Sequence, residues 1–137
     1  MVSSCPAIME HEAQTRVIIG CAMTVHRALG PGFLESVYKN ALTYELRLAG
    51  MSVEREKPLE VRYRGVMIGA FNADILVDER LLVEAKAVRA LAPSHEVQTV
   101  NYLTAAGLDT GLLLNFGAPR LEFRRKWREY RKRASTG

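Results

Sequence analysis

Three charged residues lie inside apolar, strand-like segments of the sequence, where charge is normally excluded. Asp74 lies in one segment, and Glu84 and Lys86 lie two positions apart in the next. Side chains two positions apart share one face of a strand, so the three groups converge on one patch if the segments pair. Carboxylate oxygens suit Mg²⁺ or Mn²⁺, and the ammonium is then free to orient or activate a water molecule. A salt bridge between Lys86 and one acid is the competing interpretation.

Two helical segments and one histidine add further candidates for a site. Glu35 and Tyr38 are three residues apart after a glycine-rich break, and Gln98 and Tyr102 are four residues apart, so each pair shares a helix face. Glu35 is also explained as a first-turn acid favoured by the helix dipole, and the second pair as a solvated face. His26 is either a metal ligand or a hydrogen-bonded structural residue.

The elements that would position these residues follow from the hydrophobic periodicity. Apolar residues recur every three to four positions in the helical segments and every second position in the first strand. Pro93 and Ser94 open the third helix, with Ser94 as its N-cap. The expected order is helix, helix, three strands forming an antiparallel meander, helix and strand, at residues 12–29, 33–49, 51–65, 66–78, 81–88, 93–106 and 110–117.

Length and charge indicate one domain followed by a basic tail. A chain of 137 residues with 48% apolar content is the right size for a single core. Residues 124–133 hold seven basic residues and one acidic residue, a local charge of +6, so the rest of the chain carries −2 of the total of +4. We therefore expect one domain over residues 1–123, and attraction to phosphate concentrated in a tail over residues 124–137.

The lengths of the apolar runs also indicate where in the cell the protein is expected. None approaches the roughly 20 residues that a membrane helix requires, and the N-terminus lacks the basic-then-apolar pattern of a signal peptide. We expect a cytoplasmic protein without a membrane partner.

Taken together, the elements and their charged residues resemble the PD-(D/E)XK nuclease superfamily over residues 26–116. Asp74 followed ten residues later by Glu-x-Lys, and a helix with Gln-x-x-x-Tyr, carry this likeness. The stretch GPGFLESVY resembles the Gly-x-x-Glu-x-x-Tyr element of the bacterial GxxExxY proteins, through Gly32, Glu35 and Tyr38. Ala73 stands where the superfamily pattern has proline. The resemblance implies an α/β fold with a mixed sheet, a restriction-endonuclease-like αβββαβ core with an extra N-terminal helix.

The resemblance also implies roles for the charged residues of the two strands. Asp74 and Glu84 match the acids that bind Mg²⁺ or Mn²⁺, with the Ala85 carbonyl oxygen as a further ligand. Lys86 matches the lysine that positions or polarises the attacking water. The implied function is metal-dependent hydrolysis of phosphodiester bonds in DNA. A nucleic-acid-binding or partner-binding module that has lost catalysis is the alternative.

The helical residues receive roles from the same resemblance. Glu35 is similar to an additional helical acid that contributes to the metal site of many members. Gln98 and Tyr102 resemble a motif that RecB-like nucleases place near the catalytic site and the DNA. His26 is similar to a histidine that some RecB-like members use as another metal ligand.

The basic tail is expected to bind nucleic acid. Its arginines and lysine would contact phosphates, and Trp127 would stack on a base. The residues concerned are Arg124, Arg125, Lys126, Trp127 and Arg128. With little chain left for a sequence-reading module, substrate choice would depend on nucleic-acid structure, on a homodimer or on a protein partner.

Overall fold

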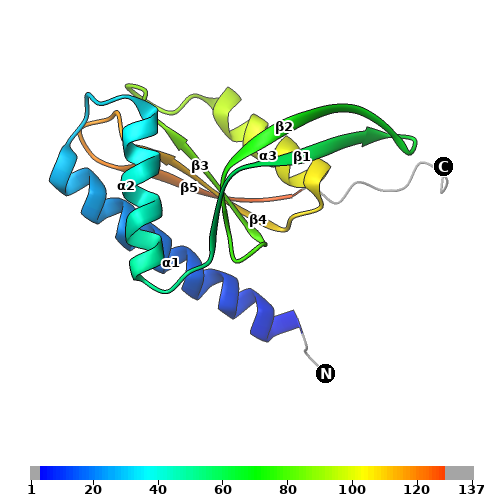
Figure 1. The fold of residues 1–137 in the computed structure, drawn as a ribbon, viewed down its shortest axis with the longest axis horizontal. Coiled ribbons are helices and arrows are strands. Elements are labelled where there is room, and N and C mark those ends of the chain that lie inside the picture. The colour runs from blue at the N-terminus through cyan, green and yellow to red at the C-terminus, as the bar shows by residue number, and fades with distance from the viewer. Residues whose placement is uncertain (1–3, 129–137) are drawn as a thin grey trace.

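The computed structural model describes residues 4–128, with side chains described from residue 11 onward. Three helices and five strands follow one another in the order helix, helix, three strands, helix and two strands (Figure 1). They are α1 (Ser4–Leu29), α2 (Glu35–Leu48), β1 (Val53–Tyr63), β2 (Val66–Val77), β3 (Leu81–Lys86), α3 (Pro93–Ala106), β4 (Thr110–Asn115) and β5 (Glu122–Trp127). The predicted order of the first seven elements is confirmed.

The strands form one mixed sheet in the order β1-β2-β3-β4-β5. The pair of β3 and β4 is parallel, and α3 makes the crossover between them, while the other neighbours are antiparallel. Helices α1 and α2 lie on one side of the sheet and α3 on the other (Figure 1). All six residues of β4 are buried, as predicted for a strand covered on both faces.

Two hydrophobic clusters fill the spaces between the sheet and the helices. The larger cluster joins α1 and α2 to the sheet and includes Ile18, Leu42 and Val83. The smaller one lies under α3 and includes Leu82 and Leu103. Because Leu82 and Val83 are adjacent in β3, their opposite placement confirms that Glu84 and Lys86 point to the side of α3.

The buried Asn115 at the end of β4 fixes the loop that leads from β3 into α3. Its side-chain oxygen accepts from the backbone N–H groups of Val88 and Gly117. Its amide nitrogen donates to the Val88 carbonyl oxygen and to Glu122. The same Glu122 oxygen accepts from the Leu91 backbone N–H at 2.9 Å. This network ties β4 and β5 to the loop and so sets where α3 begins.

Some details differ from the sequence-based prediction. Helix α1 begins at Ser4, eight residues earlier than expected. Helix α3 has the predicted bounds, but its N-cap is Ala92 rather than Ser94, and the Ala92 backbone N–H donates to Nδ1 of His95. The tail predicted from Arg124 begins instead within β5, which pairs with β4 along its whole length. Residues 129–137 of that predicted tail lie outside the described residues.

Candidate active site

Asp74 lies where the hairpin of β1 and β2 separates from the rest of the sheet. Strand β2 has twelve residues, yet it pairs with β3 only over residues 75–77. Beyond that point the hairpin projects from the body of the molecule (Figure 1). The neighbours Ala73 and Ile75 belong to the clusters on opposite sides of the sheet, whereas a regular strand would place both on one side.

An irregular backbone at this position turns the Asp74 side chain toward β3. Glu56, which would face Asp74 in the pairing of β1 with β2, has a φ of 52° and no partner in the strand register. Asp74 Oδ2 accepts a hydrogen bond from the Ala85 backbone N–H at 3.1 Å. The carboxylate therefore takes the place of a backbone acceptor between the two separating strands.

Glu84 is buried beside Asp74, with only 4% of its surface exposed. The pKa of Glu84 is raised to about 8, first by burial and then by the charge of Asp74 and a hydrogen bond between the two carboxyl groups, while Lys86 opposes the shift. A hydrogen bond between two carboxyl groups requires that one of them holds a proton. The other Glu84 oxygen, Oε1, is buried without a hydrogen-bond partner in the described structure.

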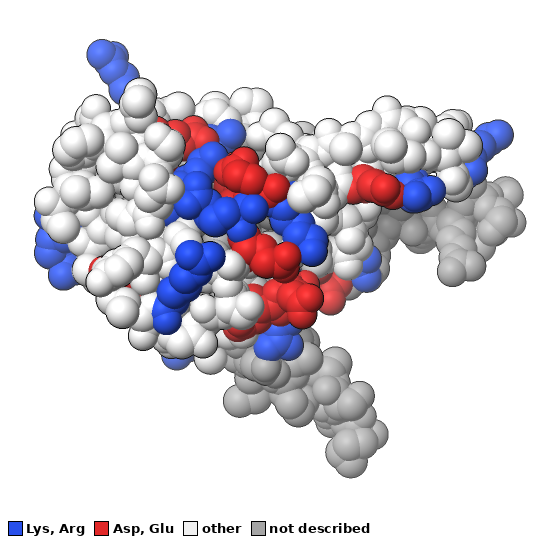
Figure 2. Space-filling model, viewed as in Figure 1, with Lys and Arg blue, Asp and Glu red and all other residues white. Residues whose placement is uncertain are grey.

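Lys39 is a site residue that the sequence analysis did not identify. Its ammonium lies 3.1 Å from Asp74 Oδ1, 3.3 Å from Glu35 Oε1 and 3.6 Å from Glu56 Oε2. Burial alone would lower the pKa of Lys39, but the hydrogen bonds and charges of Asp74 and Glu35 raise it. Acidic and basic side chains accordingly lie next to one another between α2 and the hairpin (Figure 2). Four positions separate Glu35 from Lys39, and this spacing was the signal available in the sequence.

Helix α3 brings the predicted Gln98 and Tyr102 to the same side of the sheet. Lys86 Nζ lies 3.5 Å from Gln98 Oε1. The Tyr102 ring stacks on Phe71 of the hairpin with centroids 3.9 Å apart. Burial raises the pKa of Tyr102, and the charges of Glu84 and Asp74 add to this shift. The structure thus gathers residues from β2, β3 and α3 as the sequence predicted.

Two predicted residues take structural positions instead. His26 donates from Nε2 to the Ala118 carbonyl oxygen at 2.9 Å, a structural hydrogen bond between α1 and the loop after β4. Tyr38 is fully buried, stacks on Phe116, donates to the Gly30 carbonyl oxygen, and accepts from the Phe33 N–H. It therefore anchors the glycine-rich loop.

Most of the charge on β5 is compensated within the protein. Lys126 lies 3.0 Å and Arg124 3.9 Å from the carboxylate of Glu96 on α3. Arg128 lies 3.0 Å from Asp109. The remaining two of the predicted binding residues are Arg125, whose guanidinium lies over the Phe123 ring, and Trp127, which is 62% exposed. The reason for this difference from a free basic tail is that the segment continues the sheet.

The oxygen groups at the strand junction fit a hard divalent cation. In the described part of the chain, no three His, Cys, Asp or Glu side chains are arranged to hold a metal ion, so neither Glu35 nor His26 completes such a group. The raised pKa of Glu84 nevertheless favours a proton on its carboxyl group, and one of its buried oxygens has no hydrogen-bond partner in the described structure. A divalent cation would replace that proton and engage the orphaned oxygen, since carboxylate and carbonyl oxygens are its usual ligands.

Comparison with known families identifies the group to which the chain belongs. The family model of the PD-(D/E)XK nuclease superfamily matches residues 12–126, most of the chain. The chain belongs to the PD-(D/E)XK nuclease superfamily. The predicted restriction-endonuclease-like fold is thereby confirmed together with the mixed sheet. PD-(D/E)XK nucleases generally use divalent metal ions, in agreement with the donor set at the strand junction.

Comparisons with individual proteins add to this on the fold only. A search of curated proteins finds no match. The crystal structure of SSO0001 matches with a TM-score of 0.53 at 17% sequence identity. The match covers 71% of this chain but 52% of that one, so the chain spans about half the length of SSO0001. Over residues 4–128, no helix is long and apolar enough to cross a membrane.

Proposed function

We propose that this protein is a metal-dependent nuclease that hydrolyses phosphodiester bonds in DNA, with Mg²⁺ or Mn²⁺ as cofactor. The observation that carries the proposal is the pair of carboxyl groups of Asp74 and Glu84, which lie next to each other where β2 separates from β3. Lys86 lies on the same face of β3 as Glu84. Structural acids are rarely left with an unpartnered buried oxygen. A strained, costly arrangement of this kind is typical of a functional site.

The chain's own residues would divide the work of hydrolysis. A divalent cation held by Asp74, Glu84 and the Ala85 carbonyl oxygen would polarise the scissile phosphate and lower the pKa of a water. The Lys86 ammonium would hold that water in line with the phosphorus atom, and Gln98 would orient the ammonium through its amide oxygen. Tyr102 would donate to a phosphate oxygen, since its raised pKa keeps the phenol protonated.

Within the superfamily, we place the protein with the RecB-like nucleases of the GxxExxY kind. Gly32 has a φ of 116°, a conformation that suits glycine, and Tyr38 ties the loop that contains Gly32 to α2. Glu35 then begins the helix next to the site, where it acts on Asp74 through Lys39. Each residue of the motif therefore has a physical role in shaping the site.

The proposal is tested by a cleavage assay with linear and circular, single- and double-stranded DNA in Mn²⁺ or Mg²⁺. The protein should cut at least one substrate, and Asp74→Asn and Lys86→Met should each lose cleavage by a factor of about 100 or more, the usual contribution of such groups. Glu12→Gln, on the exposed side of α1, is the matched control and should cut like the parent. Equal cleavage by all four proteins would reject the proposed site.

A module that binds nucleic acid or a protein partner without catalysis is the second candidate. The observation that favours it is the Lys39 ammonium, which contacts three carboxylates and offsets their charge without a metal. Thermal melting in Mn²⁺ separates the two functions, because a ligand that binds the folded state raises its stability. A rise in Tm at millimolar Mn²⁺, absent in Asp74→Asn, supports the nuclease, and an unchanged Tm supports the binding module.

A further inference from the structure

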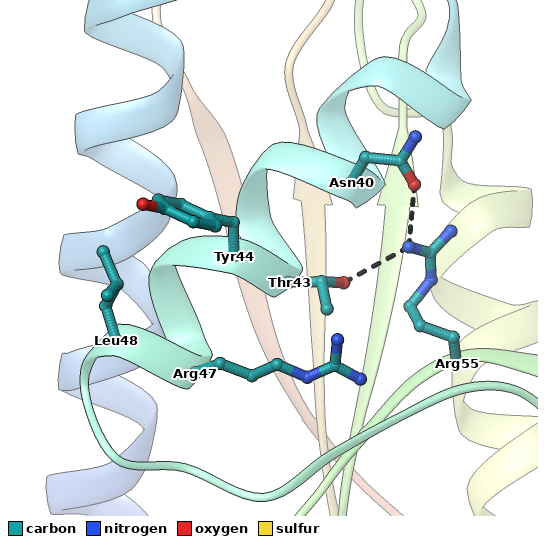
Figure 3. A pocket seen from close by; sticks show the side chains of 6 residues that line it. All are labelled: Asn40, Thr43, Tyr44, Arg47, Leu48 and Arg55. Atoms are coloured by element: carbon teal, nitrogen blue, oxygen red, sulfur yellow. Dashed lines mark hydrogen bonds between the residues drawn. The ribbon is translucent and has the colours of Figure 1, made fainter.

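A groove on the exposed side of α2 collects polar and basic groups that the catalytic site does not use. It has a volume of about 430 Å³ and is lined by Asn40, Thr43, Tyr44, Arg47, Leu48 and Arg55. Arg47 extends from α2 in the direction of β1, and Arg55 extends from β1 toward Asn40 and Thr43 on α2 (Figure 3). Tyr44 and Leu48 are 64% and 67% exposed.

Both guanidinium groups lack an acidic partner within 4 Å among the side chains of residues 11–128. Arg47 donates from Nη2 to the Val53 carbonyl oxygen at 3.1 Å. Arg55 donates from Nη1 to Asn40 Oδ1 at 2.9 Å and to Thr43 Oγ1 at 3.4 Å. These bonds hold the two side chains in place but leave their positive charges uncompensated. By contrast, Arg124, Lys126 and Arg128 at β5 are each paired with a carboxylate.

Residues of the groove are direct neighbours in sequence of residues at the candidate active site, in both α2 and β1. Lys39 contacts Asp74 and directly precedes Asn40, and Arg55 directly precedes Glu56, which contacts Lys39. Positions 35, 39, 43 and 47 lie on one stripe of α2, because four residues make about one helical turn. At 1.5 Å per residue, Arg47 lies roughly 12 Å along the helix from Lys39. That span corresponds to about three or four nucleotides of one strand in a duplex.

We infer that Arg47 and Arg55 form a phosphate-binding site that holds the backbone of the nucleic-acid substrate a few nucleotides from the carboxylates. The inference rests on the proposed function and specifies where the substrate is held. A planar guanidinium donates two parallel hydrogen bonds to phosphate oxygens, and two guanidiniums from separate elements fix the direction of the strand. Asn40 and Thr43 keep Arg55 preorganised for this contact.

The test is the binding of a short fluorescein-labelled DNA duplex, measured by anisotropy in EDTA over a range of salt concentrations. Arg47→Ala and Arg55→Ala should each weaken binding about tenfold, the usual worth of a charge-assisted hydrogen bond. Each should also lower the slope of log affinity against log salt by about one. Arg47→Lys and Arg55→Lys keep the positive charge but cannot donate two parallel hydrogen bonds. They should therefore keep the salt slope of the parent while binding more weakly than the parent and more tightly than the alanine variants.

Arg16→Ala is the matched control, because it removes one positive charge from the exposed surface of α1. Thermal melting verifies that each variant is folded. Parent-like affinity and salt slope in the double Arg47→Ala, Arg55→Ala variant would overturn the inference, and so would an equal loss in Arg16→Ala.

The binding assay tests the arginine groove and the cleavage assay tests the nuclease, so either proposal can be rejected without the other. Asp74→Asn should bind the duplex at least as tightly as the parent in EDTA and yet fail to cut in Mn²⁺. If the parent cuts while the double arginine variant binds normally, the groove is rejected and the nuclease stands. If the parent binds through the groove but cuts no DNA, the nuclease is rejected and the groove stands. Absence of any salt-dependent binding by the parent would reject the groove directly.

Discussion

At the scale of single residues, the site is a group of carboxylates that lie close together and are largely buried from solvent. The sequence allowed Asp74, Glu84 and Lys86 to be predicted, because alternation along a strand fixes which side chains share a face. Lys39 was missed because its contacts with Glu56 and Asp74 depend on how α2 crosses the hairpin. His26 was misleading because a histidine near the end of a helix can equally bond to a nearby loop, as it does with Ala118.

The buried carboxyl group of Glu84 should make the metal-free protein less stable as the pH rises. Its pKa is about 8 in the folded state against 4.5 ordinarily. Below about pH 4.5 both states hold the proton, so no penalty exists. Between about 4.5 and 8 only the unfolded state releases it, and the free energy of unfolding falls by about 1.4 kcal/mol per pH unit, to a total of a few kcal/mol.

Urea unfolding in EDTA at several pH values measures this effect. Because glutamine cannot ionise, Glu84→Gln should lack this pH-dependent loss and should be more stable than the parent at pH 9. A parallel pH dependence in parent and variant would show that Glu84 titrates normally.

Lys39→Met should bind Mn²⁺ more tightly than the parent. The ammonium repels a second cation placed near Asp74, and removing a unit charge a few ångströms away is worth about tenfold or more in affinity. Calorimetric titration measures the change. Lys57→Met is the matched control, since Lys57 lies on β1 and contacts only Glu54 among the described acids. Weaker or unchanged Mn²⁺ binding by Lys39→Met would contradict this prediction.

At the scale of elements, local irregularities position the site more than regular structure does. The periodicity predicted strands β1 to β4 because their apolar residues alternate or run continuously. It could not predict the left-handed backbone at Glu56, which depends on neighbours from other elements. Strand β5 was read as a basic tail because its charged residues outnumber its apolar ones, although Phe123 packs on the main cluster and Lys126 pairs with Glu96.

Tyr38→Phe should destabilise the protein without removing a catalytic group. The phenol donates to the Gly30 carbonyl oxygen and accepts from the Phe33 N–H, so its loss removes two part-buried hydrogen bonds at a cost of about 1 kcal/mol each. Thermal melting should show a lower Tm, while cleavage measured well below that Tm stays near the parent rate. Tyr63→Phe, at the exposed end of β1 and outside both the site and the arginine groove, should change neither quantity. Loss of cleavage in a folded Tyr38→Phe protein would instead assign the phenol to the chemistry.

At the scale of the whole molecule, two helices lie on one side of the sheet and one on the other, and the hairpin of β1 and β2 projects beside the strand junction (Figure 1). The fold class was predictable because the change of period from 3.6 to 2 and back marks the element order. The meeting of α2, the hairpin and β3 at Asp74 was not, because tertiary packing determines it. The arginine groove was also hidden, since Arg47 and Arg55 belong to different elements and no short motif joins them.

The central claim is that Asp74 and Glu84 hold a divalent cation, and calorimetric titration of Mn²⁺ into the metal-free protein tests it most directly. Unlike cleavage, this measurement cannot be produced by a trace of another nuclease. The account predicts saturable binding by the parent and by Glu12→Gln, and its loss in a folded Asp74→Asn protein. Equal binding by Asp74→Asn, or no saturable binding by the parent, would contradict the account.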